Sequence, residues 1–160
     1  MTRRITLMSF GLLALLALSA CPAESSNGSD AQEPNTDEVT LTINNIDAAA
    51  WYVVSVDGAD DVAAEGEENA NPAWQLSVGT RYRINNQGGS AHPLELLSDD
   101  ATAPPLLSQA DEGTFESDTE VDYKEDADGI TFTLTQALAD ELASYICTFH
   151  SGMEGSIITE

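Results

Sequence analysis

A short segment near the end of this chain most constrains its fold. Three side chains, Cys147, His150 and Met153, lie there in the spacing C-x2-H-x2-M. Thiolate and thioether sulfur, together with imidazole nitrogen, suit copper that changes between Cu(I) and Cu(II). One further imidazole would complete a ligand set of two His, one Cys and a more distant Met. A fold that uses this set must bring a remote histidine to the 147–153 segment.

The inventory of candidate ligands identifies that histidine. The chain contains 2 His, 2 Cys and 3 Met. Met1 and Met8 lie in the N-terminal leader and Cys21 lies at a predicted lipidation site, so the body of the protein keeps one copper ligand set with nothing spare. The second histidine of that set is His92.

Residues 1–20 have the character of an export signal. Two arginines precede an apolar run over residues 5–18 that is too short to span a membrane comfortably. The run ends in Leu18-Ser19-Ala20-Cys21, which resembles the lipobox of bacterial lipoproteins. That resemblance implies cleavage before Cys21 and attachment of lipid to it. We therefore expect an exported protein, lipid-anchored to a membrane on its periplasmic or cell-surface side; an ordinary secretory signal with a chance cysteine is the alternative.

The predicted domain organisation follows from the leader. Residues 21–38 are polar and acidic, and they cannot bury enough apolar surface to offset their chain entropy, so we predict a disordered tether. Residues 39–160 then form a single domain. Lipidation of Cys21 leaves Cys147 without a disulfide partner, and metal ligation explains a lone thiol in an exported protein.

The charge balance is extreme, with 5 basic and 28 acidic residues and a net charge of −23. This excludes nucleic acid and anionic lipid surfaces as partners. One interpretation is an acidic face that steers a basic redox partner such as a cytochrome. The other is the generally acidic surface of a protein from a very salty medium, and the spread of acids from Glu24 to Glu160 favours it.

Short alternating or β-branched segments recur between turn signals, which predicts an all-β fold, a Greek-key β-sandwich. Residues 57–71 are expected to form an acidic loop or edge hairpin, and 99–105 and 113–128 mostly loops, with room for an edge strand over 114–121. Leu138 and Leu142 are four residues apart, which predicts one short helix over 136–143, before the ligand segment. The predicted strands are 39–43, 51–56, 74–76, 80–85, 94–97, 130–135, 144–148 and 156–159.

Residues 79–97 and 144–158 together resemble the cupredoxins, and among them plastocyanin, amicyanin and the halocyanins. The first segment is similar to their strand-Asn-Asn-x-Gly-x-x-His motif, with Asn85, Asn86, Gly88 and His92 in register. The second is similar to their Cys-x-x-His-x-x-Met loop in its short, amicyanin-like spacing.

That resemblance implies a cupredoxin-like fold and one-electron transfer between protein partners, with a cytochrome or a membrane oxidoreductase as donor or acceptor. It implies no enzymatic activity. One copper ion per chain would be held by four ligands, which are His92, Cys147, His150 and Met153.

Two neighbours of the ligands depart from the family pattern. In most cupredoxins the residue after the first His donates its backbone N–H to the Cys sulfur, but Pro93 has no N–H. The second residue after the Cys is often proline in short-loop members, whereas Phe149 keeps its N–H. We therefore predict that Phe149 supplies the main backbone hydrogen bond to the Cys147 sulfur.

Several alternatives accompany this interpretation. A surface protein that stores or delivers Cu(I) would use the same ligand types, although delivery sites tend to be exposed and rich in Met or His. A cupredoxin-like domain without redox function is a second alternative. A Cys147–His150 nucleophile and base would need an orienting residue in a recognisable motif, and a structural zinc site would prefer more Cys or His and no Met.

Overall fold

The structure is a computed structural model, and it describes residues 38–160. The predictions for the leader, for lipidation of Cys21 and for the tether up to residue 37 lie outside the described residues. Glu38, which we placed at the end of the tether, instead begins the first strand. No helix within the described part of the chain is long and apolar enough to cross a membrane.

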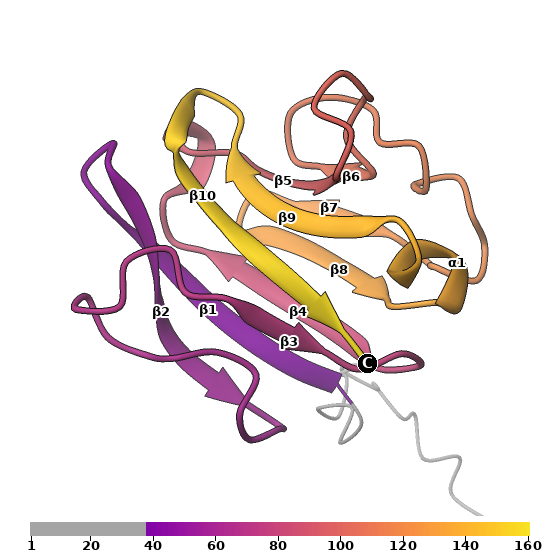
Figure 1. Ribbon diagram of the computed structural model, residues 1–160, viewed down its shortest axis with the longest axis horizontal. Coiled ribbons are helices and arrows are strands. Elements are labelled where there is room, and N and C mark those ends of the chain that lie inside the picture. Colours follow the sequence, from indigo (N-terminus) through magenta and orange to yellow (C-terminus); the bar gives the residue numbers. More distant parts are fainter. Residues whose placement is uncertain (1–37) are drawn as a thin grey trace, which may run out of the picture. The chain divides into compact units, whose positions relative to one another are not determined.

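The described residues form two five-stranded sheets, seen as two layers in Figure 1. The first has the order β2-β1-β4-β8-β7 and the second the order β3-β10-β9-β5-β6. Both are mixed, because β1 pairs with β4 and β10 with β3 in parallel while the other pairs are antiparallel. The strands are β1 (Glu38–Ile46), β2 (Ala50–Asp57), β3 (Trp74–Leu76), β4 (Arg81–Asn86), β5 (Leu94–Ser98), β6 (Leu107–Ser108), β7 (Lys124–Asp126), β8 (Gly129–Thr133), β9 (Leu142–Cys147) and β10 (His150–Thr159).

The prediction of a mostly β chain is confirmed, and the Greek-key connectivity of the cupredoxin fold stays a prediction. Inward-facing side chains of both sheets form one buried hydrophobic cluster. Strand β4 shows how the alternation builds it: Tyr82 and Ile84 are buried, while Arg81 and Arg83 lie on the outer face. The next inward position belongs to a polar residue, Asn86, which is only 3% exposed.

The predicted helix is shorter than expected. Helix α1 (Gln136–Ala139) begins after Thr135, whose hydroxyl oxygen accepts a hydrogen bond from the Leu138 N–H at 3.2 Å. The predicted helix extends to residue 143, but Leu142 pairs with Ser98 of β5. Sheet pairing therefore overrides helix propensity over residues 142–143.

The prediction of an edge strand over 114–121 is wrong, because this segment runs through successive turns. Asp118 shows the reason: its carboxylate accepts a hydrogen bond from the Glu120 N–H at 2.8 Å and its backbone carbonyl accepts from Asp122. Such local bonds compete with strand pairing. The first sheet instead has an edge strand a few residues later, at β7, and the short edge strand β6 of the second sheet was not predicted at all. A further short 3-10 helix, η1, spans Gly89–Ala91.

Candidate metal centre

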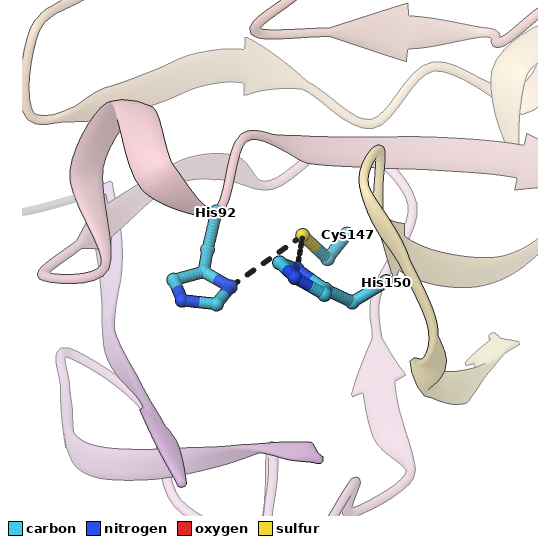
Figure 2. A group of neighbouring side chains, drawn as sticks. All are labelled: His92, Cys147 and His150. Atoms are coloured by element: carbon cyan, nitrogen blue, oxygen red, sulfur yellow. Dashed lines mark hydrogen bonds between the residues drawn. The ribbon is translucent and has the colours of Figure 1, made fainter. Parts of the chain in front are cut away.

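Three predicted ligands meet at the end of the molecule that carries the β9–β10 turn. The donor atoms of His92, Cys147 and His150 all lie within 4.8 Å of one another. The Cys147 Sγ is 3.7 Å from His92 Nδ1 and 3.4 Å from His150 Nδ1. Figure 2 shows both imidazole rings beside the sulfur, with a nitrogen of each turned toward it.

Strand pairing brings these residues together from distant parts of the sequence. Cys147 is the last residue of β9 and pairs with His150, the first of β10. On its other side Cys147 pairs with Leu94, the first residue of β5. Since His92 is two residues before Leu94, the β5–β9 register places it next to the thiol. The turn before β5 thus supplies one imidazole, and the start of β10 on the other side of β9 supplies the other.

The backbone of His92 is fixed by Asn86, which the sequence motif had singled out. The Asn86 Nδ2 donates to the His92 carbonyl at 2.7 Å, and its Oδ1 accepts from the Gly88 N–H at 2.9 Å. The inward direction of residue 86 on β4 puts this amide inside the fold. One buried side chain therefore determines the shape of the turn that presents His92.

Gln109 extends this network and was not predicted from the sequence. Its Oε1 accepts hydrogen bonds from Asn86 Nδ2 at 2.8 Å and from the Leu94 N–H at 3.1 Å, and its backbone N–H donates to the Leu94 carbonyl at 2.9 Å. It thereby acts as a further pairing partner for the start of β5. Gln109 lies in a loop without periodicity, so nothing in the sequence marks it.

Pro93 also positions the ligand turn. Its ring is buried, and its carbonyl accepts a hydrogen bond from the Thr148 N–H at 3.0 Å. The residue that cannot donate to the sulfur thus joins the His92 segment to the turn between Cys147 and His150. The side chain of Phe149 in that turn is 62% exposed. The hydrogen bond from the Phe149 N–H to the sulfur stays a prediction.

Met153, three residues after His150 in β10, is wholly buried. Its exposed fraction is 0%, and it is part of the hydrophobic core. The pairing of β9 with β10 is irregular between His150 and Glu154, so Met153 lies in a stretch released from the regular ladder. Its role as a fourth ligand stays a prediction that rests on the family resemblance.

The environment of His92 favours its neutral form. Partial burial, and then the nearby His150, lower the pKa of His92 below its ordinary value. The buried Trp51 ring meets the His92 ring edge to face, with centroids 6.1 Å apart and an angle of 73° between their planes. Neutral imidazole is the form that binds metal ions, so this environment suits a ligand.

The two sulfur–nitrogen separations are close to those that a bound metal ion would impose. Bonds of about 2.3 Å to sulfur and about 2.0 Å to nitrogen, at angles of about 110–120°, would hold sulfur and nitrogen about 3.5–3.7 Å apart. The observed separations are 3.7 and 3.4 Å. One thiolate and two imidazoles also form the soft and borderline donor set that copper prefers.

The surroundings of the centre carry little charge compared with the rest of the chain. Among residues 47–49, 87–92 and 148–152, the loops around the ligands, only Asp47 is acidic. The basic side chains of residues 38–160 lie elsewhere, on β4 and β7, and each has an acidic partner. These ion pairs are Arg81–Asp122 at 3.2 Å, Arg83–Asp126 at 2.8 Å and Lys124–Asp122 at 3.2 Å.

No family model, curated protein or solved structure matches this chain. The candidate metal centre therefore rests on the convergence of His92, Cys147 and His150 in the fold and on the chemistry of their donor atoms.

Proposed function

We propose that this protein is a cupredoxin-like, type 1 copper protein that carries single electrons between redox partners outside the cell membrane. The convergence of one thiol and two imidazoles, with both sulfur–nitrogen separations close to those required by a metal ion, carries this proposal. His92, Cys147 and His150 would hold the copper, and Met153 would be a weaker fourth ligand. When bound, copper supplies the one-electron redox chemistry.

The fold limits the movement of the proposed copper ligands. Cys147 lies between two strands, and the turn before β5 is fixed through Asn86 and Gln109. Ligands that cannot move far keep nearly the same arrangement in both oxidation states. Electron transfer then needs little rearrangement of the protein, which favours a carrier.

Burial of the sulfur ligands argues for a carrier over a protein that hands copper on. Cys147 is 1% exposed and Met153 is 0% exposed. A delivery site must let its partner reach the ion and its soft ligands, and here the core covers both sulfurs. The part-exposed His150, beside the 62% exposed Phe149, offers a route for electrons instead.

The surface around Phe149 and His150 suggests how redox partners approach. The ligand loops are nearly free of charge, so a partner such as a cytochrome or a membrane oxidoreductase would contact the Phe149–His150 turn without meeting the acidic surface. The predicted lipid anchor at Cys21 would keep the protein at the membrane where such partners work.

Addition of Cu(II) to the metal-free protein tests the proposed function. An intense visible band from thiolate-to-copper charge transfer and a narrow copper hyperfine splitting in the EPR spectrum are expected, and both should disappear on uptake of one electron per chain. Cys147→Ser is the matched control, because it keeps the imidazoles and removes the thiolate. A pale, weakly absorbing complex in the unmutated protein would contradict the proposal.

A further inference from the structure

Asn71 contacts residues 150–153, which we call the ligand loop, although its own segment of the chain supplies no candidate ligand. It lies at the end of the long acidic loop after β2, in a left-handed backbone conformation with φ of +48°. Asparagine tolerates this conformation better than most residues. Its side-chain Nδ2 donates a hydrogen bond to the Gly152 carbonyl at 3.0 Å. Gly152 lies between the proposed ligands His150 and Met153.

The other atoms of Asn71 bind the start of β2. The Trp51 N–H donates to Asn71 Oδ1 at 2.8 Å, and the Asn71 N–H donates to the Trp51 carbonyl at 2.7 Å. Trp51 is the residue whose buried ring packs edge to face against His92. Asn71 thus contacts the residue that supports one histidine and the loop that carries the other.

The hydrogen bond from Asn71 lies where the second sheet supports the ligand loop least. Between His150 and Glu154 the pairing of β9 with β10 is irregular, so the ligand loop lacks regular support there. The Asn71 amide joins this stretch, which belongs to the second sheet, to β2 of the first sheet. We infer that Asn71 is a positioning residue: it holds the 151–153 backbone against Trp51 and so fixes the distance between the His150 and His92 ends of the centre.

This inference depends on the proposed function only in the experiment on the copper-loaded protein, and not in the experiment on the metal-free protein. The Asn71→Asp substitution keeps the side-chain oxygen that accepts from Trp51 and the preference for the left-handed backbone. It removes the donor to Gly152 and places a carboxylate oxygen against the Gly152 carbonyl. The matched control is Asn69→Asp, which adds the same charge to the same loop and removes a donor to the Glu65 carbonyl, away from the ligand loop.

The first readout is amide hydrogen exchange in the metal-free protein. In Asn71→Asp the amides of residues 151–153 should exchange roughly five- to tenfold faster than in the unmutated protein, as expected for the loss of one hydrogen bond. Core amides of β1 and β4 should change little, and Asn69→Asp should match the unmutated protein. Equal acceleration in the core and in the loop would reduce Asn71 to a general structural role and overturn the inference, as would no acceleration in the loop.

The second readout is the copper-loaded protein. Asn71→Asp should lose copper to a chelator roughly tenfold faster and show a wider copper hyperfine splitting, while Asn69→Asp should do neither. An unmutated protein without the thiolate–copper band would refute the proposed function, and the exchange experiment would still decide the role of Asn71. If the carboxylate prevents folding, Asn71→Gly removes both side-chain hydrogen bonds without adding charge and keeps the left-handed backbone, and the amides of residues 151–153 should again exchange faster than those of the core.

Discussion

The buried amide of Asn86 gives a quantitative test of how the His92 turn is held. Asn86→Ala removes three hydrogen bonds, to the His92 carbonyl, the Gly88 N–H and Gln109 Oε1. Each such bond contributes a net stability of about 0.5–1.5 kcal/mol, which gives a range of about 1.5–4.5 kcal/mol. Because His92 and Gly88 are only partly buried, water can reach their freed groups in part. We therefore expect a loss of about 2–3 kcal/mol in the free energy of unfolding.

The assay is urea unfolding of the metal-free protein, so that copper binding adds nothing to the measured stability. A change in midpoint with a constant slope would report stability alone. Asn85→Ala is the control on the same strand, because its Oδ1 accepts one hydrogen bond, from Arg83 Nε at 2.8 Å. It should cost about 1 kcal/mol or less. Equal losses in the two variants would show that Asn86 has no special role.

Three further predictions concern packing, pH and salt. Gly155→Ala would push a methyl group into the ring of Tyr145, which stacks on Trp74 and donates to the Pro72 carbonyl; the expected loss is about 2–4 kcal/mol by thermal unfolding. Gly152→Ala, whose added carbon meets only the Ala49 carbonyl at 3.5 Å, should be nearly neutral, and equal losses would contradict the packing argument. The lowered pKa of His92 means that the unfolded chain binds more protons than the folded one just below pH of about 6.5, so metal-free stability should fall as pH drops through this window. His92→Gln should weaken that dependence, and an unchanged slope of stability against pH would refute the assignment. Finally, a net charge of −23 predicts that the urea midpoint rises with KCl as the screening length shrinks from about 10 Å at 0.1 M to about 3 Å at 1 M, whereas a flat response would show that charge repulsion is unimportant.

The sequence drew attention to the candidate ligands because their residue types are rare in this chain. With only 2 His and 2 Cys present, composition alone restricted the candidates for a copper set. The period of two in segments such as 81–86 predicted the strands and, with the Asn-Asn-x-Gly motif, drew attention to Asn86. These features are local, so they can be read without knowledge of the fold.

The supporting residues could not be predicted, because their roles arise from tertiary contacts. Gln109 and Asn71 both lie in loops, where no periodicity shows the direction of a side chain. Each matters through a partner distant in sequence: Gln109 through Leu94, and Asn71 through Gly152. The end of α1 was misplaced for the same reason, since β5 recruits Leu142 into a strand.

X-ray absorption at the copper edge, recorded on the copper-loaded protein in its oxidised and reduced forms, tests the central claim most directly. A centre built from Cys147 of β9, His150 of β10 and His92 of the turn before β5 should show one sulfur and two nitrogen neighbours in both forms, with small changes in distance. Loss of the sulfur neighbour, or a change of ligand number on reduction, would contradict a rigid one-electron carrier.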